Sequence, residues 1–302
     1  MAIPLRGLFP PIATAFKPDG SLAPAAPDFL AWLAAAQVDG VVALGSTGEA
    51  PSLTEAERAE WLSSVRAALP GSLRLIAGTG AESTRATLER TRAAADSGAE
   101  AALVFTPFYF RKNLTPDMVA AHYEAVASAS PIPVLIYNVP AHTGWDFHPR
   151  DWAARLGGHP NIAGLKDSSG DLVRIPYLRS VVPPDFMVLA GAGERMVAAL
   201  EAGADGAIAA LANVFPAECA TILRLTRAGD RSRADALQSR IAPLGDAFTA
   251  HYGVRGVKAV LAMLGFDHGP PRSPVATLSE SELGQLRRLL EQAQHHSEAV
   301  AS

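Results

Sequence analysis

Residues 41–78 decide the fold, and they read VVALGSTGEAPSLTEAERAEWLSSVRAALPGSLRLIAG. The stretch begins with a short apolar run, Val41–Ser46, and ends with a second one, Leu73–Gly78. Between them Glu55–Leu69 is rich in Ala, Leu, Arg and Glu, and Thr54 directly ahead of it is a helix-start signal, as is Thr115-Pro116-Asp117 farther along the chain. Strand, helix and strand in succession predict a βαβ unit with two parallel strands.

The same unit repeats over about the first 215 residues. The apolar runs are nearly continuous, as expected of strands covered on both faces. Such a chain can form a closed (β/α)8 barrel or an open doubly wound sheet of about six strands, and eight runs favour the barrel. The predicted strands are Leu8–Phe16, Val41–Ser46, Leu73–Gly78, Ala102–Thr106, Val134–Tyr137, Ala163–Lys166, Met187–Ala190 and Ala207–Leu211, and the intervening helices include Glu55–Leu69, Ser83–Ser97, Met118–Ser128 and Arg195–Ala202.

Beyond Asn213 the strand signal stops and helical patterns follow. We therefore expect a barrel over residues 1–230 and a helical extension over 231–302 that packs against it. A Gly/Pro-rich connector, Gly265–Pro274, lies within the extension. The predicted late helices are Ala217–Ala228, Arg233–Tyr252, Arg255–Leu264 and Ser279–Gln294.

Composition narrows the classes of function. The 302 residues are 49% hydrophobic with net charge −4, and no basic run suggests nucleic acid as a partner. No run of about eighteen apolar residues predicts a membrane span, and the first residues do not resemble a signal peptide. Cys219 is the single cysteine, which excludes an intrachain disulfide and suits a buried structural thiol. These features predict a cytoplasmic protein.

Lys166 is the most informative residue for chemistry. The sequence has only four lysines among its 26 basic residues, and Lys166 closes an apolar strand ahead of a Gly/Ser-rich turn. A lysine there is costly to keep charged, which suits a neutral amine nucleophile attacking a carbonyl. The alternative is a lysine whose long side chain reaches solvent.

Other unusual polar residues also follow the predicted strands. In a (β/α)8 barrel the carboxyl ends of the strands carry the active site. Two hydroxyls and exposed backbone N–H groups at a tight turn can hold a carboxylate. The segments are Gly45-Ser46-Thr47-Gly48-Glu49, Tyr137-Asn138-Val139-Pro140, Lys166 and Gly191-Ala192-Gly193, with Gly206-Ala207-Ile208 opening the last strand.

Three of these motifs carry a family resemblance that covers nearly the whole chain. Gly45–Glu49, Tyr137–Pro140 and Gly164-Leu165-Lys166-Asp167-Ser168 resemble the signatures of the dihydrodipicolinate synthase / N-acetylneuraminate lyase superfamily. The resemblance implies a class I lyase that uses pyruvate or another 2-oxo acid, without metal or external cofactor. It also implies a homotetramer built as a dimer of dimers.

The resemblance further implies roles for individual residues. Lys166 forms the imine with the ketone, and Tyr137 is the proton shuttle. Thr47 resembles the hydroxyl that relays protons from Tyr137, while Ser46 and the Thr47 N–H hold the carboxylate. Two further positions, Gly191 and Ile208, line the substrate pocket. Tyr109, in Thr106-Pro107-Phe108-Tyr109, matches a tyrosine that reaches into a neighbouring subunit's site, although subunit packing alone would also explain it.

The choice of reaction depends on residues farther from the imine. Synthases of this superfamily usually carry an arginine two residues after the proline, where this chain has His142. A neutral imidazole lacks the bidentate fork of a guanidinium. Other stretches, such as Gly253-Val254-Arg255-Gly256-Val257-Lys258, resemble 4-hydroxy-2-oxoglutarate aldolase and predict cleavage to pyruvate and glyoxylate. Candidate contacts for the distal end of the substrate are His142, Ser168 and Arg111.

Several alternatives stay open at this point. Within the superfamily they are dihydrodipicolinate synthase, condensing pyruvate with aspartate semialdehyde, and a 2-keto-3-deoxy sugar acid aldolase or dehydratase. Outside catalysis, the alternative is a protein that binds a 2-oxo acid without turnover. The Gly78-Thr79-Gly80 fragment does not complete a dinucleotide fingerprint, and the histidines lack metal-ligand spacing. Asp167 and Asp171 form either an acid/base pair or, as we expect, helix caps.

Overall fold

The computed structural model describes residues 5–295, and its centre is one sheet of eight parallel strands. The strands pair in chain order from β2 to β8, and β8 also pairs with β1. The predicted (β/α)8 barrel is therefore confirmed. The strands are β1 (Gly7–Leu8), β2 (Gly40–Ala43), β3 (Arg74–Gly78), β4 (Ala101–Phe105), β5 (Val134–Asn138), β6 (Ile162–Asp167), β7 (Met187–Ala190) and β8 (Gly206–Ala207).

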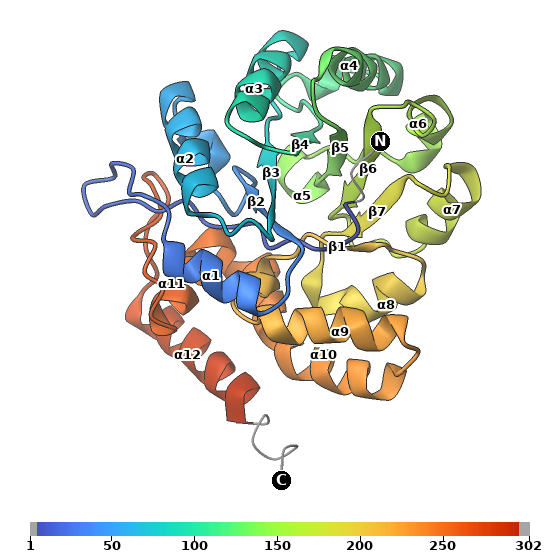
Figure 1. The fold of residues 1–302 in the computed structure, drawn as a ribbon. Coiled ribbons are helices and arrows are strands. Elements are labelled where there is room, and N and C mark those ends of the chain that lie inside the picture. The colour runs from blue at the N-terminus through green and yellow to red at the C-terminus, as the bar shows by residue number, and fades with distance from the viewer. Residues whose placement is uncertain (1–4, 296–302) are drawn as a thin grey trace.

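Helices surround these strands, as Figure 1 shows for α2, α3, α4, α6, α7 and α8. Threonines predicted to start two of the helices do cap α2 and α4, because their hydroxyls accept backbone N–H groups of the first turn. The helices are α1 (Pro27–Ala35), α2 (Glu55–Ala68), α3 (Thr84–Asp96), α4 (Pro116–Ala129), α5 (Pro140–Thr143), α6 (Pro149–Leu156), α7 (Arg174–Val181), α8 (Met196–Glu201), α9 (Pro216–Arg227), α10 (Arg231–Asp246), α11 (Gly253–Met263) and α12 (Glu280–His295).

The seam between β1 and β2 closes the barrel through a single bridge, between Pro11 and Val42. Val42 donates its N–H to the Pro10 carbonyl, and Ile12 donates to the Val42 carbonyl, both at 2.9 Å. The predicted first strand, Leu8–Phe16, is wrong in length because it is paired as β1 only over Gly7–Leu8. Pro10 and Pro11 have no backbone N–H, so the ladder cannot continue through them.

The last strand is also shorter than predicted. Instead of Ala207–Leu211, the structure has β8 at Gly206–Ala207, followed by a 3-10 helix over Ala210–Asn213. The Asn213 side chain donates to the carbonyls of Ala210 (3.0 Å) and Pro11 (2.9 Å), which ties this turn across the seam. Gly206 is required at the crossing, because an added Cβ would lie 1.9 Å from the Gly7 carbonyl oxygen.

Both faces of the strands are buried, as their continuous apolar runs predict. One cluster fills the barrel interior and includes the Tyr137 ring. A larger cluster lies between strands and helices and extends without interruption into α10, α11 and α12. The interior cluster comprises Leu5, Phe9, Val42, Ile76, Ala101, Leu103, Leu135, Tyr137, Val139, Met187, Leu189 and Ile208.

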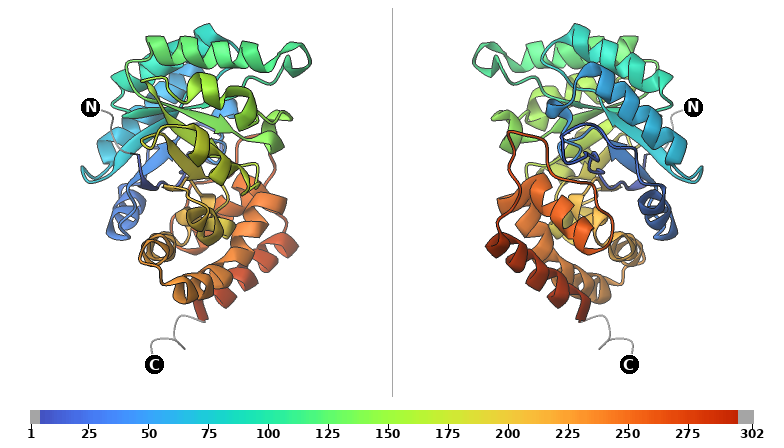
Figure 2. Two further views of the ribbon diagram at one scale, coloured as in Figure 1. Left: turned by 90° about the vertical axis from the view of Figure 1, so that its right-hand side faces the viewer. Right: turned by 90° about the vertical axis from the view of Figure 1, so that its left-hand side faces the viewer.

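The helices after residue 230 lie together on one side of the barrel (Figure 2). Gln238 of α10 connects them to the loop after β7, since its Nε2 donates to the Gly193 carbonyl at 3.0 Å. The single helix predicted over Arg233–Tyr252 is divided, because α10 ends at Asp246 and a π-helix covers Ala247–Tyr252.

Two smaller expectations concern Cys219 and membranes. Cys219 in α9 is fully buried, and burial raises the pKa of its thiol far above the ordinary value, as expected of a structural thiol. Within residues 5–295, every helix is too short or too polar to cross a lipid bilayer.

Candidate active site

A cavity of about 1310 Å³ opens at the carboxyl ends of the strands, and it brings together most of the predicted site residues. Its walls come from segments that follow each of the eight strands, from the π-helix and from the start of α11. Two predicted site residues, Tyr109 and Arg111, do not line it. Those that do are Ser46, Thr47, Tyr137, His142, Lys166, Ser168, Gly191 and Ile208.

Lys166 lies on β6 directly beside Tyr137 of β5, because the two residues are partners in the strand register. Its side chain is buried, with 5% of the residue exposed, so the alternative of a lysine reaching bulk solvent does not hold. The amine nitrogen lies 4.1 Å from the centroid of the Tyr137 ring. An ε-amine and a phenol are thus paired within one cavity.

The surroundings of Tyr137 shift its titration. Burial on its own raises the pKa of the phenol, but the positive charge of Lys166 and hydrogen bonds from Ser46, Lys166 and Ser168 outweigh it. The pKa of Tyr137 therefore lies below its ordinary value. A phenol with a lowered pKa is a better partner for proton exchange near neutral pH.

Gly45–Ala50, which we call the hydroxyl turn, carries Ser46 and Thr47 at the end of β2. Ser46 Oγ lies 3.4 Å from the Tyr137 hydroxyl oxygen. Thr47 also lines the cavity, but within residues 5–295 the hydroxyl of the turn that contacts the phenol is that of Ser46. This geometry differs from the expectation that Thr47 is the relay.

Comparison with known proteins agrees with this geometry. The model of the dihydrodipicolinate synthetase family matches residues 4–293. The chain belongs to this family. It is accordingly a class I lyase of the dihydrodipicolinate synthase / N-acetylneuraminate lyase type.

Relatives of this family match nearly the whole chain. A 4-hydroxy-tetrahydrodipicolinate synthase of Stenotrophomonas maltophilia is 39% identical over 92% of each chain. An uncharacterized DapA-like lyase of Halobacterium salinarum is 37% identical over 93% of this chain and 92% of its own. The expected special likeness to 4-hydroxy-2-oxoglutarate aldolase is not confirmed, because the synthase name recurs among these relatives.

Solved structures of family members have the same fold. The dihydrodipicolinate synthase of Acinetobacter baumannii, complexed with pyruvate, has a TM-score of 0.89 and 32% identity, covering 96% of this chain and 99% of its own. A dihydrodipicolinate synthase of Bacillus anthracis has a TM-score of 0.91 and 26% identity, with the same coverage of both chains.

His142 stands where the family resemblance leads us to expect an arginine in a synthase. It lies on α5 and lines the cavity, where partial desolvation and the nearby charge of Lys166 lower its pKa, although the residue remains exposed at the cavity wall. The imidazole is therefore neutral at pH 7 and can offer one hydrogen bond rather than a charged fork. Arg111 is exposed and does not line the cavity.

Ser168 and Gly191 form the wall of the cavity next to Lys166. Ser168 donates its N–H to the Asn138 carbonyl at 2.9 Å, which places its hydroxyl beyond the end of β6. An added Cβ on Gly191 would lie 2.0 Å from Ser168 Oγ. Glycine at position 191 therefore leaves room for that hydroxyl at the cavity wall.

Asp167 and Asp171 hold the turn after β6. Asp167 Oδ1 accepts the N–H of Ser169 at 2.9 Å, and Asp171 Oδ1 accepts that of Val173 at 3.1 Å. Neither carboxylate lines the cavity, which argues against an acid/base pair. They bind the turn ahead of α7 rather than capping the helix itself, whose N-cap is Val173.

Tyr109 does not line the cavity of its own chain, and 73% of the residue is exposed. Its N–H and that of Phe108 donate to Glu82 Oε2 at 2.8 and 3.0 Å, which fixes the loop. The next residue, Phe110, is 63% exposed yet lines the cavity mouth. Tyr109 therefore has no contact with Lys166 or Tyr137 within one subunit.

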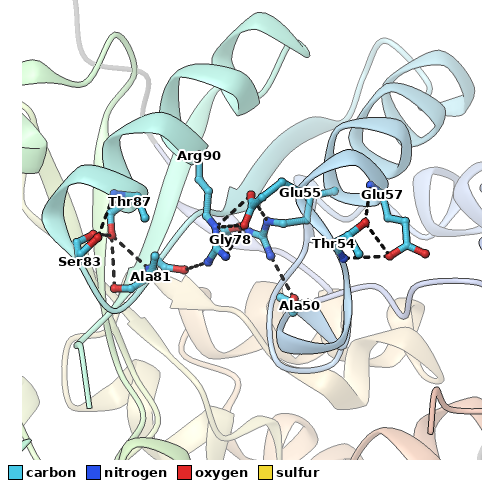
Figure 3. A network of polar contacts seen from close by, with 12 residues as sticks. Ala50, Thr54, Glu55, Glu57, Gly78, Ala81, Ser83, Thr87 and Arg90 are labelled. Atoms are coloured by element: carbon cyan, nitrogen blue, oxygen red, sulfur yellow. Dashed lines mark hydrogen bonds and ion pairs between the residues drawn. The ribbon is translucent and has the colours of Figure 1, made fainter. Parts of the chain in front are cut away.

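Two arginines that could not be identified from the sequence, Arg58 and Arg90, also line the cavity. Figure 3 shows Arg90 beside Glu55 of α2, with which it forms an ion pair. Arg58 is buried and donates to the carbonyls of Ala50 (3.1 Å) and Gly78 (2.6 Å). Burial and the charge of Arg90 lower its pKa to about 10. Arg90 donates to the Gly80 carbonyl at 2.7 Å. These arginines connect the hydroxyl turn to the loop after β3, and an arginine in a helix gives no local signal of such a role.

Sequence analysis also missed the partners of Glu49 in the hydroxyl turn, which are Lys258 and Arg272. One signal was present, since Lys258 is among only four lysines and stands in the apolar run Val257-Lys258-Ala259-Val260. A lysine among apolar residues of a buried helix face needs a partner charge. Within the part of the chain that the structure describes, no group of three His, Cys, Asp or Glu side chains is arranged to hold a metal.

Proposed function

We propose that this protein makes or breaks a carbon–carbon bond to pyruvate through an imine on Lys166. The observation that carries the proposal is the buried Lys166 amine beside a Tyr137 phenol whose pKa is lowered. Family membership supports it, and so does the relative that is complexed with pyruvate. In this proposal Tyr137 moves protons, Ser46 relays them, and Thr47 with the N–H groups of the hydroxyl turn binds the carboxylate.

The proposed chemistry uses only groups of this chain. The Lys166 amine adds to the ketone carbon of pyruvate, and water leaves to give a protonated imine. Tyr137, as phenolate, removes a methyl proton, and the C–H electron pair forms the enamine while the imine nitrogen becomes neutral. The enamine carbon then attacks an aldehyde carbonyl, whose oxygen takes a proton from Tyr137. The imine acts as the electron sink, so the proposal needs no external cofactor.

We propose condensation with aspartate semialdehyde as the first candidate reaction, because relatives named 4-hydroxy-tetrahydrodipicolinate synthase match nearly the whole chain. The second candidate is cleavage of 4-hydroxy-2-oxoglutarate to pyruvate and glyoxylate. His142 favours it, since a neutral imidazole cannot replace the arginine fork that binds the distal carboxylate of the semialdehyde. Cleavage of 2-keto-3-deoxy sugar acids is a third member of the same reaction class.

Borohydride reduction in the presence of pyruvate tests the imine. We expect a covalent adduct on Lys166, its absence in Lys166→Ala, and its retention in Lys112→Ala, which removes an exposed lysine. No adduct on wild-type Lys166 would contradict the mechanism. An adduct without turnover of any aldol substrate would indicate a protein that only binds a 2-oxo acid.

The variant His142→Arg tests the choice of reaction. Rates are measured with pyruvate plus aspartate semialdehyde and with 4-hydroxy-2-oxoglutarate. If the wild type is an aldolase, the variant gains condensation and loses cleavage, because the added fork binds the distal carboxylate of the semialdehyde. If the wild type already condenses at the higher rate, the first candidate stands and His142 supplies that contact itself.

We also propose that the protein acts as a cytoplasmic homotetramer in which Tyr109 completes the site of a neighbouring subunit. The exposed Tyr109, Phe110 and Met118 side chains support this proposal, since they leave a large apolar surface uncovered in one subunit.

A further inference from the structure

Glu49 fastens the hydroxyl turn to the C-terminal segment of the chain. Its Oε1 lies 2.7 Å from Lys258 Nζ of α11, and its Oε2 accepts the N–H of Arg272 at 2.8 Å. The Glu49 and Lys258 side chains are only 4% and 2% exposed. Glu49 also has a φ of 51°, a left-handed conformation that a non-glycine residue holds only under constraint.

Lys258 is buried among residues of the described chain, with 3% of the residue exposed. Its amine donates to the Pro270 carbonyl at 2.9 Å and lies 4.4 Å from the centroid of the Phe16 ring. Burial lowers the pKa of Lys258, while the hydrogen bond to Glu49 opposes that shift. Two charges without water attract strongly and resist separation. The pair therefore acts as a short rigid link between α11 and the hydroxyl turn.

Stability is a weak explanation for this link. Apolar residues of similar volume in place of a buried ion pair are often as stable or more stable. Arg272 already joins the connector to the barrel, since its guanidinium pairs with Glu57 of α2 at 2.7 Å and donates to the Gly20 carbonyl. The Glu49–Lys258 pair adds an attachment at the turn that carries the substrate-facing hydroxyls.

Two contacts connect the Glu49–Lys258 pair to Tyr137, and both pass through Ser46. The Glu49 N–H donates to the Ser46 carbonyl at 3.1 Å, so the two residues move together. Ser46 Oγ lies 3.4 Å from the Tyr137 hydroxyl, which is near the limit of a hydrogen bond. A small displacement of Glu49 away from the barrel axis would break that contact.

We propose that Lys258 is a positioning residue of the active site, which holds the hydroxyl turn through Glu49 so that Ser46 stays in contact with Tyr137. The inference rests on the proposed function, because the contact matters only if Tyr137 transfers protons. It makes the helical extension a part of the catalytic unit rather than an appendage.

Exchange of the pyruvate methyl protons with D2O, followed by NMR, tests this role without a second substrate. In each exchange a methyl C–H bond of the pyruvate imine breaks, the proton passes to Tyr137, and the electron pair forms the enamine. The phenol exchanges this proton with D2O and returns a deuteron to the enamine carbon, which restores the protonated imine. The variant Glu49→Gln/Lys258→Met removes both charges and leaves neither unpaired. We expect its Lys166 adduct to form at saturating pyruvate while exchange slows about ten- to a hundredfold, the scale of a small misplacement.

The pH dependence of the exchange rate distinguishes a positioning role of Lys258 from a general loss of structure. The Ser46 hydrogen bond lowers the pKa of Tyr137, so its loss moves the rising limb of the exchange profile to higher pH. Lys166, whose charge also acts on Tyr137, and His142 are unchanged in these variants. The control Arg179→Met removes a partly buried cation beside Asp205, at the amino ends of β7 and β8. We expect it to lower thermal stability without moving the profile.

Two further variants keep the test decisive if the double variant does not fold. Glu49→Asp keeps the charge but shortens the link by one methylene, and we expect the same slow exchange in a folded protein. Lys258→Arg keeps a cation at this position, and we expect it to retain most of the wild-type exchange rate. Exchange at the wild-type rate with an unmoved profile in Glu49→Asp or the double variant overturns the proposal. A wild type without a Lys166 adduct would contradict the proposed function instead.

Discussion

At the scale of residues, the site depends on one register pair. Tyr137 and Lys166 are partners across β5 and β6, so a phenol and an ε-amine line the same cavity. The Lys166 charge counteracts the burial of the phenol and lowers the pKa of Tyr137. Proton exchange between substrate and phenol is then possible close to neutral pH.

The variant Tyr137→Phe tests this pair. We expect pyruvate methyl exchange to slow about a hundredfold or more, because the ring remains and only the proton-transfer group is lost. The Lys166 adduct should still form on longer incubation with pyruvate and borohydride. The matched control is Tyr177→Phe on α7, outside the cavity, which should exchange at the wild-type rate. Near-normal exchange in Tyr137→Phe would remove Tyr137 from the mechanism.

At the scale of elements, a polar contact between α3 and α4 makes the stability of the fold depend on pH. His122 of α4 is buried and contacts Thr84 Oγ1 at the start of α3 through Nδ1, at 2.9 Å. Its Nε2 has no hydrogen-bond partner in the described part of the chain. Burial lowers the pKa of His122 from 6.5 to about 4, so the folded protein keeps this imidazole neutral.

The free energy of unfolding should therefore decrease as the pH is lowered from 6.5 to about 4. Below pH 6.5 the unfolded chain binds a proton at His122, whereas the folded chain does not bind it until the pH approaches 4. The contribution of neutral His122 to the free energy of unfolding is fully lost once the pH is below about 4. At pH 5 the expected loss from this residue is about 2 kcal/mol. Urea unfolding at pH 7 and pH 5 measures it, and His122→Leu should lose that part of the pH dependence. His251→Gln, a change at an exposed histidine, should not alter the difference.

At the scale of the whole molecule, the extension and the barrel share one hydrophobic core. The barrel supplies Lys166 and Tyr137, while the extension supplies Lys258 and closes the cavity with the π-helix. In the proposed homotetramer Tyr109 would extend the same principle beyond one subunit, since its exposed side chain does not line its own cavity.

Mixing two inactive variants tests the proposed exchange of Tyr109 between subunits. Tyr109→Ala lacks the donated phenol and Lys166→Ala lacks the amine, so homo-oligomers of either should be inactive or nearly so. Mixed oligomers contain some sites with both groups, and we expect activity to return after mixing and refolding together. Sedimentation measures the assembly of each sample. Full activity of Tyr109→Ala alone, with unchanged assembly, would contradict the role.

Much of this protein was predictable from local sequence. The βαβ order, the helix starts at Thr54 and Thr115 and the burial of Cys219 all follow from short-range rules of periodicity and capping. The strand ends at Tyr137 and Lys166 also placed both residues on the rim that lines the cavity. These features depend on residues that are close in the chain, which is why the sequence alone determined them.

Only the tertiary structure decided which hydroxyl contacts the phenol and which charges hold it there. The hydroxyl of Ser46, not that of Thr47, contacts Tyr137, and Glu49 in the same turn has a left-handed conformation and pairs with the distant Lys258. The same limit applies to β1 and β8, whose lengths depend on pairing across the barrel seam. Neighbouring residues do not encode such contacts, because their free energy comes from burial of groups that meet only when the barrel closes.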